Sequence, residues 1–340
     1  MSSNSFTLDI NEKYTRLVDI SFLNGKITLE SLGVANTIGN FFDDDTEKSI
    51  ENQSEIISKM CGDLKINKKN VKVIIPDSQS FSQILEFPKL NEKELLSAVR
   101  YQSDQFIPMP IEEIVLDIEV LKEDKEKSKN TILIIASPKK IVDRVEKAVE
   151  YAGLSPESLE NELSAFGRFY SEVLAPQQKG ATIALNFGFT NTSLYLVDSA
   201  TSMILMNRNL KLGLDLFLKE LRFNFELPET KAFDVLKTIG FEKNASYDVG
   251  TITAPILREL LNETSKFILL GKEKFALPIT KIYCYNHNNH ILAFEKKITE
   301  LLSIPAESLL LREQLVPNPL SQSFSSDMSS FISGMGGAIR

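Results

Sequence analysis

The sequence predicts an α/β protein made of two similar lobes with a cleft between them. The chain has 340 residues, more than the roughly 250 to 300 at which a single hydrophobic core stops growing. Its composition, 43% apolar and 25% charged residues, is that of an ordinary soluble globular protein. A pattern of strand, turn, strand, turn and strand occurs twice, around residues 9–30 and 186–206. Together these observations indicate a duplicated lobe.

The two copies of this repeat align from 9–18 and from 186–195. In each copy an apolar strand leads through a polar turn into a second, alternating strand, and the third strands follow at 26–30 and 203–206. A chance likeness between two hairpins is the alternative explanation. The aligned pairs are Asp9 with Asn186, Asn11 with Gly188, and Thr15 with Thr192.

The segment between the copies begins with two predicted strands. Residues 71–75 form a short buried strand, and residues 81–87 form an alternating one that Pro88 closes. Asn91 then caps a helix, and Glu94 completes its capping box. The helix has one apolar stripe before the prolines at 108 and 110, made by Leu95, Leu96, Val99 and Phe106.

Two further strands, 115–121 and 131–136, follow this helix. The charged run 122–129 between them mixes both signs, which is typical of a solvated hairpin tip. A second helix runs from about residue 138 to 152 and ends at Gly153. These elements predict a small α+β subdomain inserted into the first lobe.

Charge and hydropathy exclude several classes of protein. The net charge of −8 and a pI near 5.1 argue against nucleic-acid binding, which needs a clustered basic surface. No apolar run reaches the roughly 18 residues of a membrane span, and no signal peptide is visible. We therefore expect a cytoplasmic protein. Cys61 and Cys284 are expected to be reduced thiols, mostly buried.

The residues give no support for catalysis. Both histidines, His287 and His290, lie in one turn, so no Ser/His/Asp or Cys/His arrangement is available, and there is no Walker-type phosphate loop. The spacing of three could bring the two imidazoles together. No cysteine or carboxylate pair accompanies them, however, so we expect a helix N-terminal cap and no metal site. We expect no catalytic residues and no enzyme activity.

Several stretches resemble the PilM family of type IV pilus assembly proteins. The most specific is "LNEKELLSAVRYQSDQFIPMPIEEIVLDIEVL" at 90–121, and weaker similarity includes "AVEYAGLSPESLENELSAFGR" at 148–168 and the closing "GMGGAIR". The resemblance implies an actin-like fold, with ribonuclease H-like duplicated lobes, related to the cell-division protein FtsA. It implies a first lobe (1A) at 1–70, 154–180 and 320–340, an inserted subdomain (1C) at 71–153, and a second lobe (2A/2B) at 181–319.

This resemblance also implies a function. PilM proteins lie in the cytosol under the inner membrane and bind the short N-terminal tail of the bitopic membrane protein PilN, and so connect to other pilus platform proteins. We therefore expect an adaptor peripheral to the inner membrane. The alternatives are an ATP-binding switch or ATPase of the same fold, or a cytosolic component of type II secretion. Candidate residues for the peptide groove are Phe81, Leu85, Phe87, Phe106, Ile107 and Pro108.

Actin-like proteins hold ATP phosphates on two hairpins and the base on a Gly-rich turn, because glycine lets backbone N–H groups approach the ligand closely. Here asparagines stand at several of those positions, and Asn186 replaces a carboxylate that would help to hold hydrated Mg²⁺. We expect nucleotide binding to be lost or weak, with no cofactor; ATP with Mg²⁺ is the alternative. The equivalent positions are Asp9, Asn11, Lys13, Asn186, Gly188, Thr190, Gly213, Asn286 and Asn288.

Overall fold

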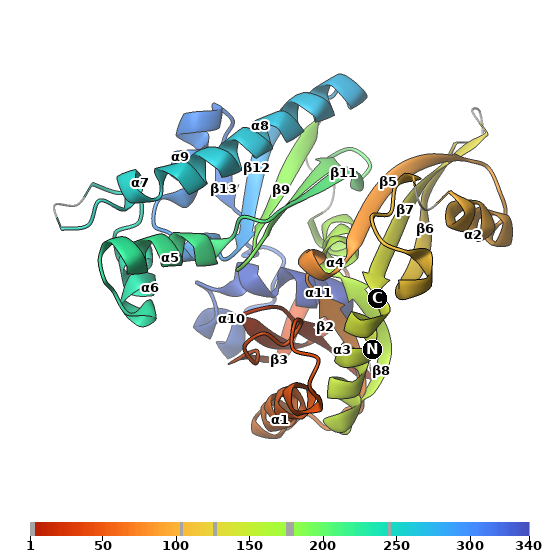
Figure 1. The fold of residues 1–340 in the computed structure, drawn as a ribbon, viewed down its shortest axis with the longest axis horizontal. Helices are drawn as coiled ribbons and strands as arrows, with labels where there is room; N and C mark the ends of the chain where they lie inside the picture. The colour runs from red at the N-terminus through yellow and green to blue at the C-terminus, as the bar shows by residue number, and fades with distance from the viewer. Residues whose placement is uncertain (1–3, 103–104, 125–127, 175–179, 244–245, 340) are drawn as a thin grey trace.

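The computed structural model describes residues 4–102, 105–124, 128–174, 180–243 and 246–339 (Figure 1). Three residues of the predicted hairpin tip, 125–127, lie outside the described residues. The chain forms two lobes, each built on a five-stranded sheet, and a smaller three-stranded unit beside the first lobe.

The first lobe contains a mixed sheet with the strand order β3-β2-β1-β4-β8. Strands β1 and β2 form the first predicted hairpin, and their register pairs Ile10 with Thr15 and Asp9 with Arg16. Helices α1 and α3 pack against one face of this sheet, while α4 and α11 pack against the other. The strands are β1 (Ser5–Ile10), β2 (Tyr14–Leu23), β3 (Lys26–Asn36), β4 (Asn70–Ile75) and β8 (Ser155–Asn161). The helices are α1 (Glu47–Asp63), α3 (Lys139–Tyr151), α4 (Glu162–Phe169) and α11 (Ile332–Ala338).

The second lobe has the equivalent strand order, β11-β10-β9-β12-β13. The two sheets therefore share one topology, which confirms the duplication that the repeat predicted. The strands are β9 (Ala181–Phe187), β10 (Thr192–Asp198), β11 (Met203–Leu210), β12 (Ile279–Asn286) and β13 (Ala306–Ser308). The helices are α5 (Leu214–Asn224), α6 (Glu229–Thr238), α7 (Val249–Ile252), α8 (Ala254–Phe275) and α9 (Phe294–Leu302), and α10 (Pro319–Ser323) lies near β3.

The inserted unit is smaller than the sequence predicted. Strand β4 pairs in parallel with β1, with Leu8 opposite Val73, and α3 packs on α1, so both belong to the first lobe and not to a subdomain spanning 71–153. What remains is a sheet of order β5-β7-β6 and helix α2. Its elements are β5 (Phe81–Pro88), α2 (Glu92–Tyr101), β6 (Ile114–Asp124) and β7 (Lys129–Pro138).

Helix α2 starts as predicted and ends early. The Asn91 side chain accepts from the Glu94 backbone N–H, and the Glu94 side chain returns to the Asn91 N–H, which is the predicted capping box. The helix ends at Tyr101, so Phe106 follows the helix and is not part of its stripe. Short 3₁₀ helices at Asp77–Gln79, Ile111–Glu113, Asn288–His290 and Met328–Phe331 and a π turn at Tyr170–Leu174 complete the fold.

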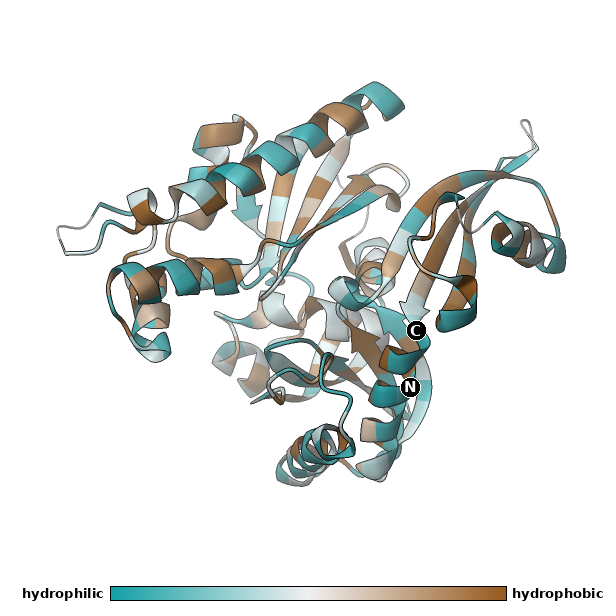
Figure 2. Cartoon of the chain, viewed as in Figure 1, coloured by the Kyte–Doolittle hydropathy of each residue, from teal (hydrophilic) through white to brown (hydrophobic). Residues whose placement is uncertain are grey.

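An apolar core joins the two lobes at their base. Helix α4 lies between the sheets, where the ring of Phe166 stacks on Tyr285 with centroids 5.1 Å apart and contacts Tyr195 at 5.2 Å. Helix α11 packs so closely on α4 that a Cβ on Gly336 would lie 2.0 Å from the carbonyl oxygen of Ala165. Figure 2 shows the apolar residues concentrated in the strands and on the inward faces of the helices.

Candidate functional site

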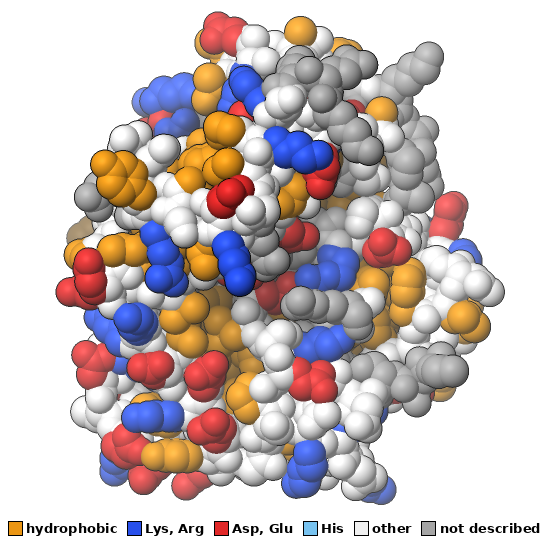
Figure 3. Space-filling view, turned by 90° about the vertical axis from the view of Figure 1, so that its right-hand side faces the viewer, with side chains coloured by type: hydrophobic (Ala, Val, Ile, Leu, Met, Phe, Trp, Pro, Cys, Tyr) orange, Lys and Arg blue, Asp and Glu red, His pale blue; other side chains and the backbone are white. Residues whose placement is uncertain are grey.

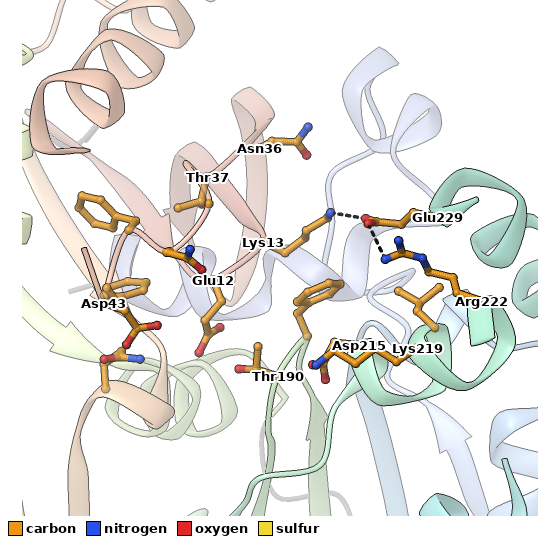
Figure 4. Close-up of a pocket in the computed structure, with 17 residues that line it drawn as sticks. Glu12, Lys13, Asn36, Thr37, Asp43, Thr190, Asp215, Lys219, Arg222 and Glu229 are labelled. Atoms are coloured by element: carbon orange, nitrogen blue, oxygen red, sulfur yellow. Dashed lines mark hydrogen bonds and ion pairs between the residues drawn. The ribbon is translucent and has the colours of Figure 1, made fainter. Parts of the chain in front are cut away.

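A cavity of about 500 Å³ lies between the lobes. The first lobe contributes Glu12 and Lys13 from the β1–β2 turn and the loop 36–43, and the second lobe contributes Thr190 and residues of α5 and the start of α6. In Figure 4, Lys13 extends across the cavity and Glu12 points toward Thr190. We call this space the cleft cavity. Among the predicted nucleotide positions, only Lys13 and Thr190 line it directly.

Lys13 links the two sides of the cleft cavity. Its ammonium group donates to Glu229 Oε1 over 2.7 Å, and Arg222 lies 3.6 Å from the other carboxylate oxygen (Figure 4). The Lys13 Nζ also lies 5.2 Å from the ring centroid of Phe189. The Lys13 and Glu229 side chains are 25% and 42% exposed, so water screens the pair and its contribution to stability is small.

Arg16 lies on β2, three residues after Lys13, and is only 2% exposed. Its guanidinium group donates to Asp9 Oδ2 over 3.1 Å and to Asn286 Oδ1 over 3.1 Å, and it lies 3.5 Å from His287 Nε2. Asp9 belongs to the first lobe, whereas Asn286 and His287 belong to the second. Burial raises the pKa of Asp9 to about 6, although Arg16 acts in the opposite direction.

The turn after β12 keeps the backbone shape that asparagine permits. Asn286 has a φ of 77°, in the left-handed region that asparagine tolerates. Its side-chain amide donates to Asn186 Oδ1 over 2.9 Å. Asn288 donates instead to Glu295 and Ser308, so its side chain is bound within the second lobe.

The two histidines of this turn contact each other, with their Nδ1 atoms 3.3 Å apart. His287 stands at the predicted N-cap position, before the 3₁₀ helix Asn288–His290, but its side chain makes no capping hydrogen bond. The ring packs instead between Tyr14 and Phe189. Burial, together with nearby Arg16, holds the pKa of His287 well below its usual value, so the ring is neutral and Nε2 can accept from Arg16.

The other predicted positions form tight turns. Asn11 Oδ1 accepts from the Tyr14 backbone N–H over 2.9 Å and so closes the β1–β2 turn with its own side chain. Gly188 donates its N–H to the Asn191 carbonyl oxygen over 2.9 Å. A Cβ on Gly213 would lie 2.2 Å from the Phe189 carbonyl oxygen, so close packing requires glycine there.

Buried carboxyl groups surround this polar layer. Asp77 Oδ1 accepts from the Leu163 N–H and Glu162 Oε2 accepts from the Asp77 N–H, while Tyr195 donates to Asp77 Oδ2 over 2.5 Å. Burial raises the pKa of Glu162 well above its usual value, and the charges of Asp77 and Asp9 add to the rise. Burial likewise raises the pKa of Asp77 and of Glu12.

Sequence reasoning missed Arg16, Asp77 and Glu162. A signal for Arg16 was present: the turn after Ile10 places Arg16 directly opposite Asp9 in the hairpin, and the apolar residues Leu17 and Val18 follow it. Opposite charges that lie directly across from each other on two antiparallel strands are expected to form an ion pair. No comparable local signal exists for Asp77 and Glu162, which are far apart in the chain.

The predicted groove residues lie mainly in the core of the inserted unit. Phe87 and Ile107 are buried there, and Phe81, Leu85 and Phe106 pack against them under α2. Pro108 is exposed. The alternation of β5 was therefore predicted correctly, and its apolar face is the one that α2 covers.

The opposite face of this small sheet borders a groove of about 310 Å³. Glu119, Val120 and Leu121 of β6 form one wall, and Gly167 and Ser171 lie on the other. We call this the β6–α4 groove. Strand β6 is an edge of its sheet. Figure 3 views the side of the molecule that carries the inserted unit, where apolar side chains lie among acidic and basic ones.

Among the described residues, no group of three or more His, Cys, Asp or Glu side chains is arranged to hold a metal ion. Nor does the described part of the chain contain a helix long and apolar enough to cross a membrane. Cys61 is partly exposed and Cys284 is buried, and both are free thiols.

Comparison with known proteins identifies the fold and a family. The family profile described as type IV pilus assembly protein PilM matches residues 7–306. A solved structure titled PilM-PilN type IV pilus biogenesis complex superimposes with a TM-score of 0.86 at 21% identity, covering 100% of this chain and 99% of that chain.

More distant structures share the same fold. MreB 5 of Spiroplasma citri bound to AMPPNP has a TM-score of 0.53 at 11% identity, covering 98% of this chain and 94% of the other. A Bacteroides thetaiotaomicron protein with an actin-like ATPase fold has a TM-score of 0.51 at 8% identity, covering 99% and 95%. The predicted actin-like fold is therefore confirmed.

Proposed function

This chain belongs to the PilM family of type IV pilus assembly proteins, and from that premise we propose that it is an adaptor that binds the short cytosolic N-terminal tail of a PilN-like membrane protein. The structural neighbour whose title names PilM with PilN supports this choice of partner. Through that tail the protein would be held at the inner membrane from the cytoplasmic side, and from there it would contact other proteins of the pilus platform.

The observation that carries this proposal is the β6–α4 groove beside the open edge of β6. An edge strand offers unpaired backbone N–H and C=O groups, so an extended peptide can add to the sheet while its side chains enter the groove. Val120, which is 44% exposed on β6, provides an apolar contact. Arg168 is held by Glu160 over 2.7 and 3.0 Å, which fixes the opposite wall.

In this proposal the predicted groove residues support the groove from the opposite face of the small sheet. They are Phe81, Leu85, Phe87, Phe106 and Ile107. They form the apolar layer between the small sheet and α2, and so hold β6 in position. The peptide itself would contact the other face of the sheet. Truncating these residues would loosen the inserted unit and weaken binding indirectly.

We also propose that the cleft does not hold Mg²⁺ with a nucleotide, although MreB of the same fold is described with AMPPNP. The supporting observation is that several buried polar groups beside the cleft are bound to each other. Arg16 donates to Asp9 Oδ2, Asn286 donates to Asn186, and Asn11 Oδ1 accepts within its own turn. Asp9 Oδ1 has no hydrogen-bond partner, but a hydrated cation at this oxygen would meet the positive charge of Arg16, which is bound to Oδ2. We therefore propose no ATPase activity.

A peptide titration tests the adaptor proposal. The probe is a synthetic peptide with the sequence of the cytosolic N-terminal tail of the PilN-like protein from the same genome, and binding is measured by calorimetry. Val120→Asp should weaken binding of the peptide by at least about tenfold, because it places a charge against an apolar contact. Val115→Asp is the matched control, since Val115 is equally exposed on the same strand and lies outside the groove. If both variants bind the peptide with equal affinity, the β6–α4 groove is not the binding site.

A second titration tests the nucleotide proposal. The purified protein, freed of nucleotide, is titrated with MgATP, and its melting temperature is measured with and without MgATP. A ligand that binds the native state must raise its stability. We expect no heat of binding and no shift in melting temperature. Binding at micromolar strength would instead favour an ATP-gated switch.

A further inference from the structure

Arg16 joins the two lobes from a position that water does not reach. The side chain starts on β2 of the first lobe, and its guanidinium group contacts Asp9 of the same lobe. From the second lobe it contacts the Asn286 side-chain oxygen at 3.1 Å and His287 Nε2 at 3.5 Å. One buried cation is therefore bonded on both sides of the boundary between the lobes.

Two other contacts join the lobes. The apolar core around Phe166 contains residues of both, and Lys13 of the cleft cavity binds Glu229 of the second lobe. Arg16 adds a polar contact that is fully buried. Tyr14 lies beside it, with its ring centroid 5.7 Å from the Arg16 guanidinium carbon and 5.6 Å from the His287 ring.

A buried guanidinium group is stable only when its charge is balanced and its N–H groups are bonded. Asp9 balances the charge whether the lobes are close or apart, since both residues lie in one hairpin. The Asn286 contact differs, because it exists only while the lobes are close. Asn286 is itself held by Asn186, so the acceptor is fixed in place before Arg16 reaches it.

We propose that Arg16 is a built-in cation that holds the two lobes closed without any ligand. The Asp9–Arg16 pair on one lobe and the Asn286–Asn186 pair on the other form the two halves of this contact, which we call the Arg16 lock. The closed arrangement is then determined by the sequence and does not respond to an exchangeable cation or anion. This inference goes beyond the adaptor function and does not depend on the partner.

The distance between the lobes measures the state of the lock directly. Spin labels at Lys48 on α1 and Lys231 on α6, both exposed, report the separation across the cleft by pulsed electron resonance. The background carries Cys61→Ser, and Cys284 is fully buried and does not react. In the otherwise unmodified protein we expect one narrow distance distribution that Mg²⁺ with AMPPNP leaves unchanged. A broad distribution that narrows on adding Mg²⁺ and AMPPNP would overturn the proposal.

Asn286→Gly breaks the lock from the second lobe. Glycine keeps the left-handed backbone of this turn, removes the acceptor of Arg16, and leaves the Asp9–Arg16 pair intact. We expect the distance distribution between the two labels to shift to longer distances and to broaden. Asn24→Gly is the matched control, because Asn24 also has a left-handed backbone, with a φ of 52°, and its exposed side chain lies in the β2–β3 turn of the first lobe. Its distances should match those of the unmodified protein.

The double variant Asp9→Asn with Arg16→Met breaks the lock from the first lobe. It removes both charges together, so no unpaired ion is left in the interior. We expect the lobes to open as in Asn286→Gly. If both sets of variants fold and keep the narrow distribution, Arg16 does not hold the lobes. If one variant does not fold, the other decides the question.

Discussion

The side-chain amide of Asn286 donates to the side-chain oxygen of Asn186 over 2.9 Å and so joins the ends of β12 and β9. Asn186 also hydrogen-bonds to the carboxyl group of Glu162. An amide suits this position because it can accept from one neighbour and donate to the other. A carboxylate at residue 186 could only accept.

Asn186→Asp should therefore destabilise the protein. The substitution removes the donor to Glu162 and adds a negative charge beside a buried carboxyl group, and we expect a loss of roughly 2 to 4 kcal/mol in the free energy of unfolding. Urea unfolding at neutral pH measures it. Asn209→Asp, on the exposed side of β11, is the control and should stay within about 0.5 kcal/mol of the parent. Equal losses in the two variants would contradict the role given to Asn186.

The buried carboxyl groups predict how stability changes with pH. The pKa of Glu162 is raised in the folded protein, so the folded state binds its proton more tightly than the unfolded state does. This contribution to stability is fully present below the unfolded pKa near 4.5 and is lost as pH rises through the folded pKa. Burial of His287 acts oppositely, because its lowered pKa makes stability fall as pH drops below about 6.5.

Glu162→Gln isolates the carboxyl contribution, since glutamine resembles the protonated acid at every pH. Relative to the parent, this variant should gain stability steadily as pH rises from 5 to 8. Unfolding by urea at several pH values gives the difference curve. Glu157→Gln changes an exposed position on β8. The stability of this control should change with pH as that of the parent does. A flat difference curve for Glu162→Gln would show that Glu162 does not titrate differently on unfolding.

Packing of α11 on α4 predicts a strong response at Gly336. An alanine Cβ would lie 2.0 Å from the carbonyl oxygen of Ala165, and only a shift of the backbone can relieve that contact. We expect Gly336→Ala to lower stability by about 2 kcal/mol or more. Gly250→Ala in α7 is the control, because its nearest neighbour lies at 3.8 Å. Thermal unfolding of the two variants side by side measures the effect, and similar melting temperatures would refute the close packing.

Lys13 and Arg16 should differ in their importance although both bridge the lobes. Lys13→Met removes a partly exposed ion pair and keeps an apolar contact with Phe189, so we expect a loss below about 1 kcal/mol. Arg16→Met leaves Asp9 unpaired in the interior and should cost about 3 to 5 kcal/mol. Denaturant unfolding in low and high salt checks the contrast, because salt should weaken only the Lys13 contribution. A large loss for Lys13→Met would reverse this ranking.

The sequence was sufficient to predict the duplicated fold because strands and turns leave local patterns. The hairpins at Asp9 and Asn186 share one spacing, and the capping box at Asn91 marks a helix start by its own residues. The convergence of Asp9, Asn186 and Asn286 also followed from the resemblance. Each of these features depends on neighbours in the chain or on a repeated segment.

Other features depend on packing that no local pattern encodes. The buried state of Arg16 requires the second lobe to cover β2, and the Asp77–Glu162 contact joins residues 85 positions apart. The face of β5 that α2 covers could not be distinguished by alternation, because both faces of that sheet are partly apolar. The predicted boundary at residue 71 failed for the same reason: only strand pairing shows that β4 belongs to the first lobe.

Helix α11 packs against β1, β2 and α4, and this has a consequence for synthesis on the ribosome. The second lobe is continuous in sequence and can complete its core as soon as it emerges. The first lobe, although its strands are made earlier, lacks part of its core until residues 332–338 have left the exit tunnel. Nascent chains stalled when residue 310 has left the tunnel but residues 332–338 have not should therefore show protease protection in the second lobe before the first, so that the lobe translated last is the first to mature.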